Sequence, residues 1–247
     1  MKADPFAQLK LLDVQELDSA QDQLRHRLES LPQIAELKEL TALRAEVDDR
    51  ARDARIRVDD LTRAQKRADA DVEQVKARRK RDQDRMEQGL VGNPKDLERM
   101  QSELVSLERR IADLEDQELE VMEELETAQR ELDELTTTSA ELDERIAAAS
   151  GARDQAAAEI EKQLGEKAAE RRQTVSGLPE DLLALYTRLR EQKGGVGAAA
   201  LRARRCTGCS LQLNASDLGV MAKAPSDDVL RCEECNRILV RTLESGI

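Results

Sequence analysis

The chain contains four cysteines, and they form two identical pairs: Cys206 with Cys209, and Cys232 with Cys235. A zinc ion takes four thiolates at the corners of a tetrahedron, with Zn–S distances of ~2.3 Å. A two-residue spacer lets one tight turn direct two sulfurs at the same point, so two such turns predict a single zinc site. With four sulfur ligands no coordination position is left for water or substrate, and the zinc is expected to be structural.

Other uses of these cysteines are possible in principle. The four could form two disulfides or be unrelated buried thiols. A Cys-x-x-Cys redox motif would need one pair rather than two. We favour metal because paired C-x2-C units at this separation are typical of zinc sites.

The rest of the chain has the composition of long helices. Of its 247 residues 37% are charged, and it has one Phe, one Tyr and no Trp. Apolar residues recur in alternating steps of three and four from Leu40 to Met86 and again from Leu97 to Ile160. Such a pattern predicts coiled-coil helices.

The two periodic segments are separated by a short break that contains Gly89 and Gly92, followed by Asn93 as a helix cap and Pro94 as a first helical residue. A turn near 88–95 between two long helices predicts an antiparallel hairpin. Pro32 predicts a kink near 30–32, after a first helix over 5–29. The hairpin domain is therefore assigned to 1–175.

The second predicted domain, 176–247, consists of a short helix and a C4 zinc ribbon. An amphipathic helix is expected over 180–192, and strands are expected over 198–203, 229–231 and 238–241 around the cysteine pairs. A fold of this size lacks a large core, so metal binding should contribute much of its folding free energy. The predicted class is mainly α, a long antiparallel coiled-coil helical hairpin followed by a small C-terminal C4 zinc ribbon.

Two groups of basic residues could contact a polyanion, although the net charge is −12. They lie near the hairpin turn and before the first cysteine: Lys76, Arg78, Arg79, Lys80 and Arg81, and Arg202, Arg204 and Arg205. The first group can instead form ion pairs with Glu98, Glu103 and Glu108 on the other arm, and we favour this interpretation. The ribbon has no Trp or Phe on which a base could stack.

The chain resembles a known family over essentially its whole length. Leu182 to Leu189, Gly194-Gly195, the four cysteines and Arg237-Ile238-Leu239 look like the bacterial C4-type zinc-ribbon family with an N-terminal coiled-coil hairpin, which includes the flagellar regulator FlgZ. The resemblance implies a non-enzymatic adaptor, and some members are linked to a sigma factor or to messenger RNA. Asn236 stands where the family often has Gly, and Asn tolerates the left-handed backbone.

We therefore expect a non-enzymatic, zinc-binding adaptor or scaffold that mediates protein–protein interaction, with a role in gene regulation. The alternative is an RNA- or DNA-binding protein that uses the ribbon and the basic hairpin tip. No nucleophile–base pair or phosphate loop is visible, so we expect neither catalysis nor a small-molecule substrate. No apolar run matches a membrane span or a signal peptide, which favours a cytoplasmic protein without membrane contact.

Overall fold

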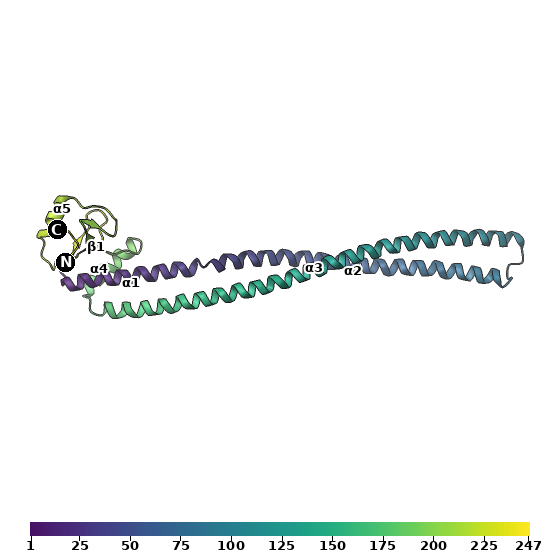
Figure 1. Ribbon diagram of the computed structural model, residues 1–247, viewed down its shortest axis with the longest axis horizontal. Coiled ribbons are helices and arrows are strands. Elements are labelled where there is room, and N and C mark those ends of the chain that lie inside the picture. Colours follow the sequence, from purple (N-terminus) through teal and green to yellow (C-terminus); the bar gives the residue numbers. More distant parts are fainter. The chain divides into compact units, whose positions relative to one another are not determined.

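The computed structural model describes all residues from 1 to 247 and confirms the predicted fold class. It forms two compact units, which we call the ribbon unit (Met1–Ile34 with Gly151–Ile247) and the hairpin unit (Ala35–Ser150). The helices are α1 (Pro5–Glu29), α2 (Pro32–Glu87), α3 (Pro94–Val175), α4 (Glu180–Gln192) and α5 (Ala215–Lys223). The strands are β1 (Ala198–Arg202), β2 (Arg205–Cys206), β3 (Leu230–Arg231) and β4 (Ile238–Arg241) (Figure 1).

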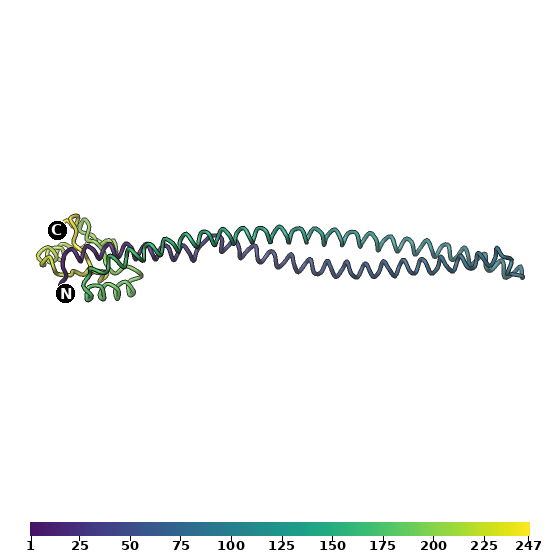
Figure 2. Tube along the Cα trace, turned by 90° about the horizontal axis from the view of Figure 1, so that it is seen from below, coloured from purple at the N-terminus to yellow at the C-terminus, as the bar shows by residue number.

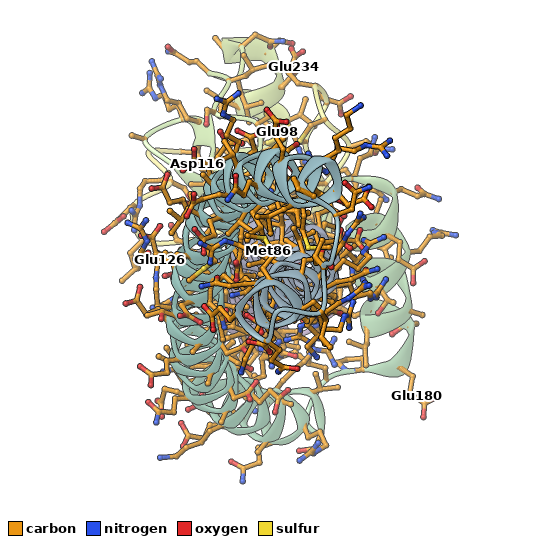
Figure 3. The ribbon with its side chains drawn as sticks, turned by 90° about the vertical axis from the view of Figure 1, so that its right-hand side faces the viewer. Met86, Glu98, Asp116, Glu126, Glu180 and Glu234 are labelled. Carbon is orange, nitrogen blue, oxygen red and sulfur yellow. The ribbon has the colours of Figure 1, made fainter.

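In the hairpin unit α2 and α3 run side by side, as both views of the chain show (Figures 1 and 2). Their apolar positions form one cluster across the two helices, which comprises Leu40, Val47, Ala54, Leu135, Leu142 and Ala149. Met86 is half-buried, whereas Glu98, Asp116 and Glu126 are exposed and project outwards (Figure 3). The heptad pattern thus separates a buried seam from a charged surface.

The helix ends fall close to the breaks in the sequence pattern. α1 stops at Glu29 and α2 starts at Pro32, while the hairpin turn occupies the residues between Glu87 and Pro94. Gly89 has a φ of 65°, in the left-handed region, and the side chain of Asn93 accepts a hydrogen bond of 3.0 Å from the Lys95 amide. Glycine adopts the left-handed conformation without steric cost, so Gly89 suits the turn. Asn93 caps the N-terminus of α3 with its side chain.

The ribbon unit contains one four-stranded sheet in the order β2-β1-β4-β3. β1 runs parallel to β4, and the two outer strands pair antiparallel to their neighbours. One face of the sheet, through Ile238 and Val240, packs against α1 and α4. The other face, through Leu201 and Leu239, packs around Cys206 and Cys232. The sheet therefore separates a helical core from the metal centre.

The two units divide the chain differently from the boundary predicted at residue 175. The first helix belongs with the ribbon, because Ala7, Leu11 and Val14 lie in the same core as α4 and the sheet. The N-terminal backbone also joins it: the Ala3 amide donates to the Asp227 carbonyl at 2.8 Å, and the Val229 amide donates to the Met1 carbonyl at 3.1 Å. Short strands bury little area, so a helix must cover one face of the sheet.

A buried carboxylate connects three helices of the ribbon unit. Asp18 on α1 accepts a hydrogen bond of 2.7 Å from the Tyr186 hydroxyl on α4. It also forms an ion pair with Arg171 on α3 at 2.5 Å, and a longer one with Arg190 at 3.5 Å. Burial, together with the neighbouring carboxylate, raises the pKa of Tyr186, so the phenol stays protonated and remains the donor.

Replacing Tyr186 with phenylalanine should destabilise the ribbon unit by about 1.5–3 kcal/mol, the range for a hydrogen bond to a charged group. The aromatic ring stays in place, so the decrease in the free energy of unfolding measures the contribution of the hydroxyl group alone. Denaturant unfolding of the zinc-loaded protein measures this difference. A change below about 0.5 kcal/mol would mean that the two arginines satisfy Asp18 without the phenol.

None of the helices is both long and apolar enough to cross a membrane.

Candidate metal centre

The four cysteines lie on two turns that share one backbone geometry. In the first turn, Cys206–Leu211, the Ser210 amide donates to the Cys206 carbonyl at 2.8 Å, and Ser210 has a φ of 63°. In the second turn, Cys232–Arg237, the Asn236 amide donates to the Cys232 carbonyl at 2.7 Å, and Asn236 has a φ of 60°. The left-handed residue after each second cysteine folds the chain back, so both sulfurs of a pair point to the same side.

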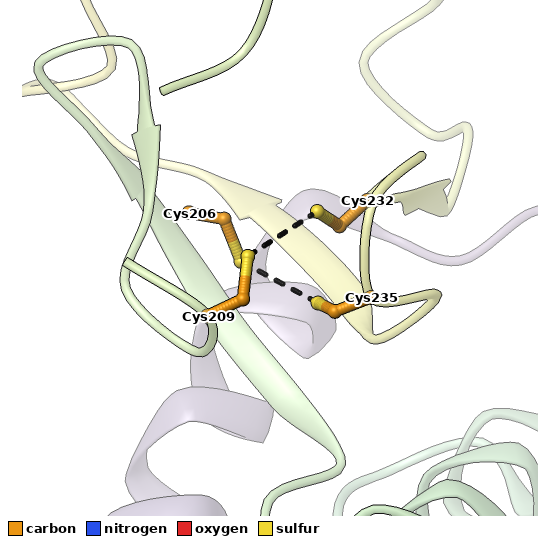
Figure 4. Close-up of side chains that lie close together, drawn as sticks. All are labelled: Cys206, Cys209, Cys232 and Cys235. Carbon is orange, nitrogen blue, oxygen red and sulfur yellow. Dashed lines mark hydrogen bonds between the residues drawn. The ribbon is translucent and has the colours of Figure 1, made fainter. Parts of the chain in front are cut away.

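The two turns bring the four sulfurs to one point (Figure 4). The ligand atoms all lie within 4.8 Å of one another, and the sulfurs of Cys206 and Cys235, and of Cys209 and Cys232, are 3.9 Å apart. A tetrahedral zinc ion with Zn–S bonds of ~2.3 Å requires sulfur–sulfur separations of ~3.8 Å. The cysteines are free of disulfides. The four thiols therefore fit one structural zinc ion.

The surroundings of the thiols determine how zinc binding is coupled to proton release. Burial raises the pKa of Cys206, and it raises the pKa of Cys232 to about 12. For Cys235 burial acts in the same direction, but hydrogen bonds from the Arg237 backbone and side chain, together with those from the neighbouring thiols, outweigh it and lower the pKa to about 7. Without metal, buried thiols of raised pKa stay protonated at neutral pH. Zinc requires thiolates, so binding must release protons and must weaken as the pH falls.

Two arginines support the second cysteine turn from outside. Arg231 donates through Nε to the Asn236 carbonyl at 2.9 Å, at the left-handed position of the turn. Arg237 donates through Nε to the Val196 carbonyl and through Nη2 to the Lys193 carbonyl, both at 2.9 Å. The Arg237 bonds attach the second turn to the segment that leads into β1.

Gly208 in the first turn has no room for a side chain. An added Cβ would lie 2.9 Å from the Cβ of Ala199 and 2.9 Å from the Cδ of Arg237. Gly208→Ala should therefore displace Arg237 or the turn and cost about 1–3 kcal/mol of ribbon stability. Zinc release to a coloured chelator, followed against denaturant, measures this cost.

Gly219 on α5 provides the matched control for this substitution. An added Cβ meets nothing within 4 Å there, so Gly219→Ala should be neutral or slightly stabilising. Equal zinc release from the two variants would contradict the steric argument at Gly208.

Comparison with known proteins places this arrangement in a family. Residues 14–194 match the CT398-like coiled coil hairpin domain, and residues 205–239 match the C4-type zinc ribbon domain. The first match spans well over half of the sequence. The chain belongs to the CT398-like coiled-coil hairpin family.

Relatives of this CT398-like protein match it over nearly their whole length. A Mycobacterium tuberculosis protein, Rv2229c, is 34% identical over 98% of both chains. A solved structure from Mycobacterium smegmatis is also 34% identical, covers 98% of this chain and 100% of its own, and superposes with a TM-score of 0.85. The structure of CT398 from Chlamydia trachomatis shares the fold at 19% identity, with a TM-score of 0.68 and 96% and 98% coverage.

The basic run near the hairpin turn of this CT398-like protein is largely paired with carboxylates. Lys76 lies 2.7 Å from Glu115 and Arg79 lies 2.9 Å from Glu108, while Arg78 pairs with Glu103. These are ion pairs between the two arms, as we favoured from the sequence, although Glu98 takes no part in them. Lys80 and Arg81 are exposed and have no ion pair. The predicted group of five therefore divides into paired and unpaired members.

The arginines before the first cysteine surround the β1–β2 turn. Arg202 pairs with Glu244 at 2.5 Å, and Arg204 donates to the Gly246 carbonyl at 3.1 Å. Both side chains thereby contact the C-terminal segment. Arg205 is exposed and has no ion pair. Of the three, it is the one whose side chain carries no structural contact.

Two features of the ribbon unit were not predicted from the sequence. The buried side chain of Gln15 accepts hydrogen bonds from the amides of Gly197 at 2.7 Å and Ala198 at 3.3 Å, and so positions the start of β1. A groove of about 550 Å³ also lies between α1 and the sheet, and Leu9, Leu12 and Leu243 contribute to its lining. A single glutamine in a helix and scattered leucines give no periodic signal, so sequence reasoning had no means of finding either.

Proposed function

We propose that this CT398-like protein is a non-enzymatic adaptor that mediates protein–protein interaction, in a cytoplasmic setting and in gene regulation, as the family resemblance implies. A coiled-coil hairpin joined to a structural zinc ribbon is a scaffold-like organisation. The four zinc ligands leave no open coordination position for substrate. We expect no small-molecule substrate and no membrane association.

The observation that carries the proposal is the apolar groove of the ribbon unit. The side chain of Leu243 is fully exposed at its edge, and Leu9 is 41% exposed. Phe6, one turn before Leu9 on α1, is 78% exposed, although it is the only phenylalanine in the chain. Exposed apolar side chains gathered beside a groove are typical of a site that another protein covers.

The polar residues that line the groove are compatible with a bound peptide. Arg202 and Glu244 form an exposed ion pair at its rim, and such a pair contributes little to stability, so it can exchange partners. Arg241 also lines the groove, but its guanidinium is occupied by the carbonyls of Ala224 and Pro225. A partner segment would place apolar side chains on the leucines and a charged group at the rim, as interfaces with an apolar centre and a polar edge do.

The test is capture of partners from a lysate of the native host by zinc-loaded protein, with and without nuclease. We expect a protein partner that survives nuclease and is lost with Leu9→Asp/Leu243→Asp. The matched control is Leu211→Asp/Val220→Asp, which alters two exposed apolar residues of the same unit that do not line the groove. Zinc content checks that each variant is folded.

Two outcomes would count against the adaptor. If nuclease removes every captured protein and only nucleic acid is recovered, the nucleic-acid alternative replaces it. If both double variants capture the partner equally well, the groove is not the docking surface.

A further inference from the structure

The hairpin unit exposes a row of apolar side chains along α3, in addition to its buried seam. Val105 is 50% exposed, Leu119 is 55% exposed and Met122 is 41% exposed. Val105, Ala112 and Leu119 follow one another at intervals of seven residues, and Ala112 is exposed as well. Met122 follows Leu119 by three positions and therefore lies on the same side of the helix. We call these four residues the α3 stripe, and their spacing is that of a coiled-coil contact.

The α3 stripe lies beside the seam rather than on it. Its first three residues each follow directly after a half-buried seam position, namely Leu104, Ile111 and Glu118. From its first to its last residue the stripe extends over about 26 Å of helix. A third helix packed against α3 would bury this stripe, in the way that the helices of a coiled coil bury one another.

Carboxylates without a cationic partner surround the second half of the stripe. Between Glu115 and Leu132, α3 contains eight Asp and Glu against one Arg. Glu115 pairs with Lys76, and Glu126 lies 3.9 Å from Arg130. The other six carboxylates form no ion pair: Asp116, Glu118, Glu120, Glu123, Glu124 and Glu131.

The facing stretch of α2 does not neutralise this surface. It extends from Ala54, which belongs to the same apolar cluster as Leu132, to Lys76, which pairs with Glu115. It contains six Lys and Arg against five Asp and Glu. One of these cations, Arg57, lines a groove together with three carboxylates, which are Glu120, Glu123 and Glu124. This part of the hairpin unit therefore keeps an excess of negative charge.

We propose that the α3 stripe binds a basic amphipathic helix of a partner protein. The apolar side chains of this helix pack on Leu119 and Met122, and its Lys and Arg side chains meet the carboxylates of Asp116 and Glu123. Asp116 precedes Leu119 by three positions and Glu123 follows it by four, so both lie next to it on the helix surface. The stripe shares no residue with the apolar groove of the ribbon unit, so the two proposals can fail separately.

A helix of another protein fits the stripe better than a second copy of this chain does. Residues 63–81 of α2 contain eight Lys and Arg against three Asp and Glu, so they match the stripe in charge. They expose no large apolar side chain, however, because the exposed ones on α2 are Ile34, Leu43 and Ile56. Protein partners derive most of their affinity from buried apolar and aromatic side chains, which this part of α2 cannot supply. A nucleic acid is repelled by the same carboxylates that attract a basic helix.

The test uses a fluorescein-labelled model peptide of leucine and lysine, about 18 residues long to match the stripe, with its leucines at helical spacing. Anisotropy measures its binding to the zinc-loaded full chain, and a peptide of the same composition in scrambled order is the reference. Leu119→Gln/Met122→Gln should weaken binding of the amphipathic peptide by about tenfold or more, because central apolar side chains carry most of the affinity. Glutamine is a good helix former and adds no charge, so the variant should keep α3 intact.

The matched control for the apolar variant is Leu43→Gln/Ile56→Gln. Leu43 is 45% exposed and Ile56 is 59% exposed, and both lie on α2, outside the stripe. This control removes the same amount of exposed apolar surface from the hairpin unit and should leave peptide binding within about twofold.

A second pair of variants tests the charge. Asp116→Asn/Glu123→Gln should weaken binding about fivefold, because two exposed ion pairs with the peptide are lost. Its control is Asp53→Asn/Asp59→Asn, which makes the same change of net charge at two exposed carboxylates of α2 without ion pairs. This control should stay within about twofold of the wild type, since screening limits the effect of charges farther from the stripe.

Several outcomes would overturn the proposal. They are the absence of binding, equal binding of the scrambled peptide, and equal weakening by the stripe variants and their controls. Light scattering of the chain alone tests the second copy, and we expect the same molar mass for the wild type and for Leu119→Gln/Met122→Gln. A larger mass for the wild type that this variant loses would show that a second copy covers the stripe, and the assignment to a partner helix would be wrong.

Discussion

Cys232→Ser will abolish binding of the single zinc ion and unfold the sheet of the ribbon unit, while the helices of the hairpin unit persist. Cys232 is 1% exposed and lies among Leu201, Leu213 and Leu239 in the core around the metal. Structural zinc sites contribute an apparent ~10–16 kcal/mol, more than a small unit has in reserve. A serine hydroxyl does not replace the thiolate as a ligand.

The effect should be local, and two measurements separate it from global unfolding. Metal analysis should show one zinc per wild-type chain and none in the variant. Far-ultraviolet circular dichroism should keep most of its helical signal, because the cluster of Leu40, Val47 and Leu142 is independent of the zinc site. Limited proteolysis should cut the variant within residues 196–247, where the wild type is protected.

Glu233→Gln is the matched control for the cysteine variant. It alters an exposed residue between the two ligands of the same turn and should keep full zinc occupancy. Retention of one zinc by Cys232→Ser, with wild-type protease resistance, would show that three thiolates suffice and that the core rather than the metal maintains the sheet.

Leu11→Ala will destabilise the zinc ribbon by about 2–5 kcal/mol, although residue 11 is some 195 positions from the first ligand along the chain. Leu11 is 0% exposed and packs in one core with Leu182, Tyr186, Ile238 and Val240. Its truncation leaves a cavity beneath the sheet whose opposite face packs around the cysteines. Zinc release should therefore begin at a lower denaturant concentration.

Leu9→Ala makes the same chemical change two residues away and serves as the control. Leu9 is 41% exposed and contributes little to the core, so its loss should cost under 1 kcal/mol. If Leu11→Ala leaves zinc release unchanged and weakens only the helical transition, then α1 behaves as part of the coiled coil, and the boundary predicted at residue 175 describes the stability of the chain better.

Local patterns were sufficient to predict many elements. The amphipathic segment predicted over 180–192 coincides with α4, and the first helix predicted over 5–29 coincides with α1. The strand predicted over 198–203 ends one residue earlier, because Ala203 and Arg204 form a turn with positive φ. Apolar spacing, helix-breaking residues and caps act within a few residues of the chain, so they can be recognised without knowledge of the fold.

The candidate metal site was similarly predictable, because the ligand type and the spacing define it. The backbone of its turns was predictable in part: Asn236 was expected to adopt the left-handed conformation, while Ser210, which adopts it at the corresponding position of the first turn, carries no comparable signal. A serine is common in many conformations, so its identity alone does not predict a positive φ.

By itself the sequence thus determined the zinc ligands, the helical hairpin and the order of the elements, since spacing and periodicity are local properties. Only the tertiary structure decided that α1 covers the sheet of the ribbon, that β1 pairs in parallel with β4, and that α2 leaves the α3 stripe uncovered. Each of these depends on contacts between residues far apart in the chain. Such contacts form because the whole chain buries its apolar surface and pairs its charges, so they cannot be predicted from any short segment.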